Sequence, residues 1–227
     1  MSATIDKRQA RLTAKGAATI CDRSTSPRRS KAATPATWRV LTRSGAMIAF
    51  LDFEASSLSE DSYPVEVGWI FEDGRSESHV IRPKMDWTDW DPAAEAIHGL
   101  SREHLLAEGA SPHGVASRLL DQLTGHSLYA TAPSWDGKWL SVLLRAGGIP
   151  RHALRLRDSD EAHLEAARNL AASPEEAASI LDRVRRAQCN VQPEHRALPD
   201  ARRELGVWLE VRRLAELNRS RAANEEP

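Results

Sequence analysis

The stretch MIAFLDFEAS, residues 47–56, decides how the chain is interpreted, because its apolar run ends in two carboxylates. One apolar residue, Phe53, separates Asp52 from Glu54. In a strand, alternate side chains share a face and each residue advances about 3.3 Å, so both acids face the same way, roughly 6–7 Å apart. Two converging like charges need a cation, or one must bind a proton. The alternative is an ordinary strand end with solvated or Lys- or Arg-paired carboxylates.

The composition is that of one globular domain. The chain has 227 residues, 41% hydrophobic and 28% charged, which is enough apolar material for a core. No stretch approaches the roughly 18 unbroken apolar residues of a membrane span. Cys21 and Cys189 match no metal or redox spacing, and no secretory signal is evident. We therefore expect a cytoplasmic protein without a membrane partner.

The charge is unevenly distributed along the chain. Residues 1–46 contain 10 basic and 2 acidic residues, leaving 21 basic and 30 acidic residues in 47–227. This N-terminal segment is rich in Ser, Thr and Ala and lacks apolar periodicity, so we expect it to be disordered in isolation. A nucleic-acid-binding tail is one interpretation. The favoured one is a dispensable extension or a misassigned start, because Met47 lies at the start of the first predicted strand.

The rest of the chain predicts one α/β domain over 47–216, with 217–227 as a C-terminal tail. An Asp73-Gly74 turn joins the second and third strands as a hairpin. The predicted strands are 47–53, 63–71, 76–83, 127–132 and 153–159. The predicted helices are 92–105 with a break at Gly99, 112–124, 137–148, 160–187 split at Ser173-Pro174, and a last helix from near Pro199. A hairpin followed by alternating helices and strands predicts a mixed central sheet flanked by helices.

Three further polar residues stand at predicted element boundaries: Asp136 directly before a helix, and His195 and Asp200 around the start of the last helix. An offset of five along a helix would separate the last two side chains by about 140°. They converge if His195 lies in the loop and Asp200 in the first turn. Pro199 favours this, since proline is tolerated in an opening turn. The helix dipole stabilises an ionised Asp200 there.

Together these motifs resemble the DnaQ-like 3′–5′ exonucleases, which include the proofreading subunits of DNA polymerases, ribonuclease T and oligoribonuclease. The matching segments, in the family's order, are FLDFEASSL (50–58), VEVGWI (65–70), AIHGLS (96–101), TAPSWDGKWLSVLL (131–144) and HRALPDARREL (195–205). The resemblance implies a ribonuclease H-like fold. The histidine branch of these DEDD exonucleases places a His five residues before the last Asp. His195 occupies that position, so the chain is similar to this branch. The chain departs from the family's D-x-E-T-T-G motif after Glu54.

The resemblance implies two divalent metal ions, Mg²⁺ or Mn²⁺, held by the carboxylates Asp52, Glu54, Asp136 and Asp200. Asp52 is expected to bridge both ions. Glu54 and Asp200 are expected to complete the site of the ion that activates the nucleophile, and Asp136 to hold the second. His195 is expected to be the general base, since an imidazole titrates at about pH 6.5. The implied activity releases nucleoside monophosphates from the 3′ end of single-stranded DNA or RNA.

Further positions are assigned from the resemblance, each with an alternative. The loop after Glu54 is expected to contact the 3′-terminal nucleotide, or to be a simple turn; its residues are Ala55, Ser56, Ser57 and Leu58. His98 is expected to line the pocket, or to serve as a helix C-cap. Tryptophans are expected to stack on bases or to pack in the protein: Trp87, Trp90 and Trp135.

The helical stretch 160–187 is expected to be internal packing or a homodimer surface, with phosphate contacts from Arg183, Arg185 and Arg186. Two alternative functions remain open. One is a catalytically inactive nucleic-acid-binding or polymerase-accessory module with the same fold. The other is a structural interaction protein whose acids are ordinary surface charge.

Overall fold

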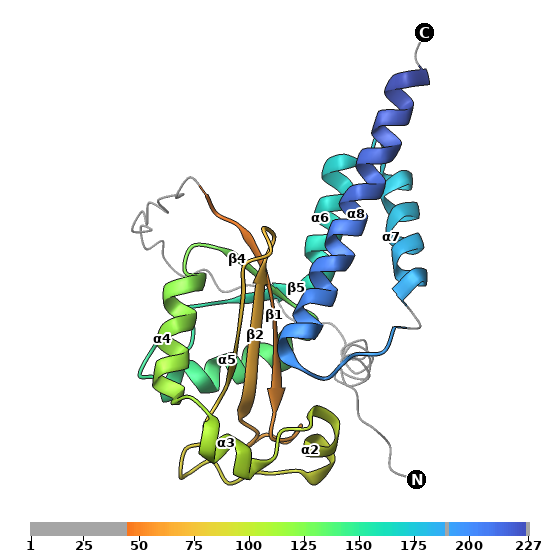
Figure 1. Cartoon of the computed structure of the whole chain (residues 1–227). Coiled ribbons are helices and arrows are strands. Elements are labelled where there is room, and N and C mark those ends of the chain that lie inside the picture. Colours follow the sequence, from red (N-terminus) through yellow and green to blue (C-terminus); the bar gives the residue numbers. More distant parts are fainter. Residues whose placement is uncertain (1–44, 189–190, 226–227) are drawn as a thin grey trace, which may run out of the picture.

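The computed structural model describes residues 45–188 and 191–225, so the predictions for residues 1–44 lie outside the described chain. Five strands form one mixed sheet in the order β3-β2-β1-β4-β5 (Figure 1). Their bounds are β1 Ile48–Ala55, β2 Pro64–Phe71, β3 Ser76–Val80, β4 Ser127–Ala130 and β5 Leu156–Asp158. β1, β2 and β3 pair antiparallel, whereas β1, β4 and β5 pair parallel. This confirms the predicted α/β class with a mixed central sheet.

Several helices also begin and end near the predicted glycine, serine and proline residues. They are α2 Pro92–His98, α3 Arg102–Glu108, α4 Pro112–Leu123, α5 Pro133–Ala146, α6 Ser159–Leu170, α7 Pro174–Gln188 and α8 Ala197–Glu225. Gly99 ends α2 in a left-handed conformation with φ 70°, and the Ser101 side chain caps α3. None of the helices within 45–188 and 191–225 is long and apolar enough to cross a membrane.

Two boundaries differ from the sequence-based expectation. α5 begins at Pro133, four residues earlier than predicted, so Asp136 lies in its first turn and not ahead of it. The cause is Pro133 itself, whose fixed φ and missing N–H suit the first helical position. α8 continues to Glu225, so the predicted boundary between 216 and 217 falls within this helix.

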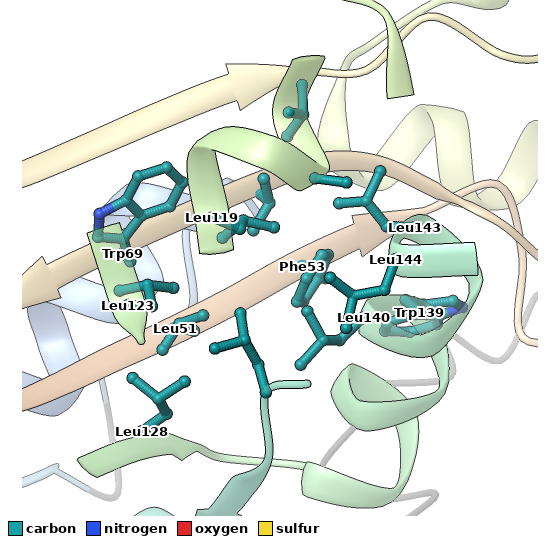
Figure 2. Close-up of a cluster of buried hydrophobic side chains, with 14 of the residues drawn as sticks. Leu51, Phe53, Trp69, Leu119, Leu123, Leu128, Trp139, Leu140, Leu143 and Leu144 are labelled. Carbon is teal, nitrogen blue, oxygen red and sulfur yellow. The ribbon is translucent and has the colours of Figure 1, made fainter. Parts of the chain in front are cut away.

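One face of the sheet carries the larger apolar core. Leu51 and Phe53 of β1 and Trp69 of β2 pack against α4 and α5, as Figure 2 shows. The helices contribute a row of buried leucines and one tryptophan: Leu119, Leu123, Trp139, Leu140, Leu143 and Leu144. Leu51 and Phe53 occupy alternate positions of β1, so the intervening residues point to the other face.

The opposite face is covered by α6, α7 and α8 (Figure 1). Phe50 of β1 and Ile70 of β2 pack there against Leu205 and Trp208 of α8. The buried sides of α6 and α7 belong to the same cluster, which supports internal packing for the stretch 160–187. Strand alternation directs Asp52 and Glu54 toward this face, where α8 begins.

The first turn of α8 lies directly on β2 at Gly68. A Cβ added to Gly68 would lie 2.4 Å from the backbone nitrogen of Leu198, so only glycine permits this approach. Gly68 is the cross-strand partner of Asp52, and Glu66 is the partner of Glu54. The register of the two strands therefore brings the start of α8 next to the two acids.

Candidate metal centre

Three of the predicted acids converge in the fold. Asp52 and Glu54 of β1 and Asp200 of α8 each offer a carboxylate oxygen, and these oxygens lie within 4.8 Å of one another. The three residues are buried, with exposed fractions of 8%, 5% and 7%. Buried like charges at this spacing disfavour simultaneous ionisation unless a cation or a proton compensates for them.

The donor set fits a hard divalent cation. All three side chains offer oxygen, which Mg²⁺ and Mn²⁺ prefer over the nitrogen and sulfur ligands typical of zinc sites. Asp200 is already oriented by the protein: Oδ1 accepts the Glu194 N–H at 3.1 Å and the Arg203 guanidinium at 2.9 Å. Oδ2 accepts the His195 N–H at 3.1 Å. Because a carboxylate oxygen has two lone pairs, Oδ2 retains capacity for a further bond.

His195 lies in the loop two residues before α8, and Asp200 lies in the first turn, which is the arrangement that makes their convergence feasible. His195 has φ 54°, a left-handed conformation that non-glycine residues adopt infrequently. The Asp200 backbone N–H closes the first helical turn by donating to the Arg196 carbonyl at 3.0 Å. The chain around the predicted base is therefore tied to a predicted metal ligand.

Asp136 occupies a different position from the other acids. It is fully buried, and its Oδ2 accepts the Ala132 N–H at 3.2 Å at the start of α5. Across residues 45–188 and 191–225, the group of acids within 4.8 Å of one another consists of Asp52, Glu54 and Asp200, without Asp136. A role for Asp136 at a second ion stays a prediction.

The loop after Glu54 is ordered by an acid that sequence reasoning missed. Asp89 accepts hydrogen bonds from the hydroxyls of Ser56 at 3.0 Å, Ser57, and Ser59 at 2.8 Å. Burial alone would raise the pKa of Asp89, but the bonds from the three hydroxyls hold that pKa below its ordinary value. The loop is thus fixed to the segment between β3 and α2.

The other predicted contact positions of this loop are partly occupied by internal packing. Ala55 is paired with Pro64 across the sheet, and the Ser56 N–H donates to the Tyr63 carbonyl at 3.0 Å. Leu58 is partly buried against the larger core. Contact of these residues with a nucleotide stays a prediction.

His98 serves the end of its helix. It is 4% exposed, and its Nδ1 accepts the Leu100 N–H at 3.0 Å directly after α2. The C-cap residue of α2 is Gly99, which follows His98, so this bond ties the chain after the helix to the His98 ring. Lining of a nucleotide pocket by His98 stays a prediction.

The tryptophans expected to stack on bases are partly buried. Trp135 packs on the larger core with its ring 5.7 Å from that of Trp139. Trp87 stacks on Tyr63 at 5.1 Å, and Trp90 donates to Glu95 at 2.8 Å. Internal packing therefore accounts for a large part of each ring, and base stacking stays a prediction for the exposed parts.

A second feature that sequence reasoning missed is the ion pair between Glu66 and Arg196. Arg196 donates to Glu66 from Nε at 2.9 Å and from Nη2 at 2.7 Å. Burial alone would raise the pKa of Glu66, but the bonds from Arg196 and the Ala197 N–H hold that pKa below its ordinary value. The sequence offered one signal for this pair: a charged residue, Glu66, within the predicted second strand, and an arginine directly after the predicted base.

Comparison with solved structures finds the same fold in exonuclease I. E. coli exonuclease I in complex with a dT13 oligonucleotide matches with a TM-score of 0.55 and 15% identity, over 77% of this chain and 43% of that one. The zinc-bound form of the E. coli enzyme with single-stranded DNA matches with a TM-score of 0.51 and 17% identity, over 78% of this chain and 41% of that one. Exonuclease I from Methylocaldum szegediense matches with a TM-score of 0.56 and 17% identity, over 74% of this chain and 41% of that one.

The chain therefore spans about two-fifths of the length of these structures. No protein-family model matches its sequence, and no curated protein matches it either. The resemblance to exonucleases predicted from the motifs is confirmed at the level of the fold. The chain has the ribonuclease H-like α/β fold of exonuclease I.

Proposed function

We propose that this protein is a metal-dependent 3′–5′ exonuclease that releases nucleoside monophosphates from single-stranded DNA or RNA. The observation that carries this proposal is the buried cluster of Asp52, Glu54 and Asp200 within 4.8 Å. Three acids from two distant segments are costly to bury together, and bound divalent cations would offset this cost alongside the Arg203 contact to Asp200. The metal site of a phosphodiesterase would account for such a cluster, because its ions would bind the three carboxylates.

The related structures support the choice of substrate. The E. coli exonuclease I structures hold dT13 and dA16 oligonucleotides and single-stranded DNA. The present chain has the same fold over about three-quarters of its length. We extend single-stranded nucleic acid to it as substrate, and leave the choice between DNA and RNA to the experiment below.

In the proposed mechanism, the ions would be held by Asp52 and Glu54 of β1 and by Asp200 of α8. Ions bound there would lower the pKa of the attacking water and stabilise the charge that develops on the phosphate. Asp136 is proposed to assist from the first turn of α5. The His195 imidazole takes a proton from the attacking water at a ring nitrogen, as a general base.

The protein contributes orientation before substrate arrives. The two backbone N–H bonds and the Arg203 bond fix the Asp200 carboxylate, so little reorganisation is needed when a cation binds. The hydrogen bonds that the serine hydroxyls donate to Asp89 fix the loop that follows Glu54. We propose that backbone groups of this loop, residues 55–58, contact the terminal nucleotide.

The test is a degradation assay on DNA and RNA strands of one sequence, labelled separately at each end. We expect Mg²⁺ or Mn²⁺ to support stepwise loss from the 3′ end, with nucleoside monophosphates as products, and EDTA to abolish it. A 5′ label should remain on progressively shorter strands, whereas a 3′ label should appear at once as a mononucleotide. Intact strands of both chemistries in Mn²⁺ would contradict the proposal and favour a binding module.

A further inference from the structure

Glu66 is a buried acid on β2, the strand next to β1, and it accepts four hydrogen bonds. Its side chain is 3% exposed. It accepts two bonds from Arg196, one from the Ala197 N–H at 3.0 Å and one from the Ser78 hydroxyl at 3.2 Å. A strand residue therefore binds both a side chain and the first backbone N–H of α8.

These bonds act on the residues that flank His195. Arg196 directly follows His195, and Glu66 is the cross-strand partner of Glu54. On the other side, the N–H groups of Glu194 and His195 are held by Asp200. His195 is thus held from both sides. One anchor is Asp200, a predicted metal ligand, and the other is Glu66, the cross-strand partner of the predicted ligand Glu54.

The left-handed conformation of His195 needs such anchors. Residues in sparsely populated backbone regions are destabilising and persist where their surroundings determine the conformation. The φ of 54° at His195 coincides with the segment fixed from both sides. Without the Arg196 anchor, the loop that carries the imidazole can relax out of this backbone conformation.

Docking of α8 does not by itself explain the ion pair. The helix is already held by apolar contacts of Leu205 and Trp208 and by its close approach to Gly68. A buried ion pair is often no more stabilising than well-packed apolar residues of the same size. Two parallel hydrogen bonds between an Arg and a carboxylate fix a direction as well as a distance. This geometry suits holding the loop in one conformation better than it suits docking of the helix.

We propose that Glu66 and Arg196 are positioning residues that hold His195 in its active conformation. This inference rests on the proposed role of His195 as the general base. It concerns the catalytic step, since Glu66 is too deeply buried to contact a nucleic acid, and a phosphate contact by the 43% exposed Arg196 side chain would instead raise KM.

The variants are chosen to separate positioning from stability and from phosphate contact. Arg196→Ala removes the anchor, Arg196→Lys keeps the charge but loses the fork, and Glu66→Gln changes the buried partner. Arg118→Ala is the matched control, because Arg118 makes the same two-pronged contact with Glu77 between α4 and β3, away from the cluster. The full chain is used throughout.

For Arg196→Ala we expect kcat to fall by about 10²-fold, the size of effect known for small misplacements, with KM changed by less than about threefold. Glu66→Gln should shift kcat in the same direction, and Arg196→Lys should lie between Arg196→Ala and the wild type. Added guanidinium should partly restore the kcat of Arg196→Ala. Amide exchange at Glu194 and His195 should be faster in Arg196→Ala and unchanged in Arg118→Ala.

Three outcomes would overturn the inference: a wild-type kcat in Arg196→Ala, a rise in KM alone, or unchanged amide exchange at His195. If Arg196→Ala does not fold, the same comparisons are made with Arg196→Lys and Glu66→Gln. A wild-type protein that hydrolyses nothing would contradict the proposed function. The exchange rates would then still decide whether the ion pair fixes this segment.

Discussion

The backbone N–H of His195 donates a 3.1 Å hydrogen bond to Oδ2 of Asp200, which belongs to the carboxylate cluster. The predicted base and a predicted metal ligand are therefore joined through the main chain, whichever way the imidazole points. A displacement of Asp200 displaces the loop that carries His195. This coupling means that substitutions at either residue affect both parts of the site.

Replacing His195 separates its chemical role from its backbone role. His195→Ala and His195→Gly should both lower kcat by about 10²–10⁴-fold, because each removes the proton acceptor. His195→Gly should be more stable than His195→Ala by roughly 1 kcal/mol, since glycine adopts φ 54° without a Cβ penalty. Denaturant titration and single-turnover kinetics measure the two effects. A wild-type rate in either variant would assign the base to another group.

Two glycine substitutions test how α8 is placed. Gly68→Ala puts a methyl group 2.4 Å from the Leu198 nitrogen, so it should lower the free energy of unfolding by about 1–3 kcal/mol. It should also weaken metal binding, because the displaced helix carries Asp200. The control is Gly206→Ala, on an exposed part of α8 with no atom within 4 Å of the new Cβ.

Gly206→Ala should raise the free energy of unfolding by about 0.5–1 kcal/mol and leave metal affinity unchanged. Chemical denaturation and a Mn²⁺ titration of both variants provide the comparison. Equal stabilities for the two variants would show that α8 does not rest on β2 at Gly68.

A pH dependence of stability is expected from His163 on α6. This residue is 6% exposed, its ring stacks on Phe50, and its Nε2 has no hydrogen-bond partner among the described residues. Burial lowers its pKa, and nearby Arg185 adds to this, while the charges of Glu204 and Asp160 oppose it. The folded protein therefore binds this proton less readily than the unfolded chain. Stability should fall as the pH decreases below about 6.5.

The change should not exceed about 1.4 kcal/mol per pH unit for this one proton. His163→Phe, which keeps a ring against Phe50, should flatten the decline of the unfolding free energy between about pH 7 and pH 5. His104→Gln, at an exposed position on α3, is the control and should leave the slope unchanged. An identical slope in His163→Phe and the wild type would exclude His163 as the source.

Local rules predicted much of the fold. The alternation around Asp52 and Glu54 predicted a strand with both acids on one face, and β1 has this form. Glycine and proline marked the breaks after α2 and before α7, because their backbone preferences act within a few residues. The same rule applied at Pro133 would have moved the start of α5 and placed Asp136 within it.

The contacts that orient the cluster depend on distant parts of the chain and so escaped prediction. Glu66 and Arg196 are 130 residues apart, and their pairing requires both the β1–β2 register and the approach of α8 at Gly68. The hydrogen bonds of Asp89 to the serine loop likewise join two loops across 30 or more positions. No local pattern specifies such pairs before the strand register is known.

Hydrolysis at the 3′ end is proposed to depend on divalent ions that the buried acids would hold. The most direct measurement is the single-turnover rate of 3′-terminal hydrolysis in Mn²⁺ for the wild type, Asp52→Asn and the control Asp73→Asn. Asp73 is an exposed acid in the β2–β3 turn that pairs with Arg75. We predict a loss of at least about 10³-fold for Asp52→Asn, several kcal/mol in the transition state, with the Asp73→Asn rate unchanged. Equal rates for Asp52→Asn and the wild type, or hydrolysis that persists in EDTA, would contradict the account.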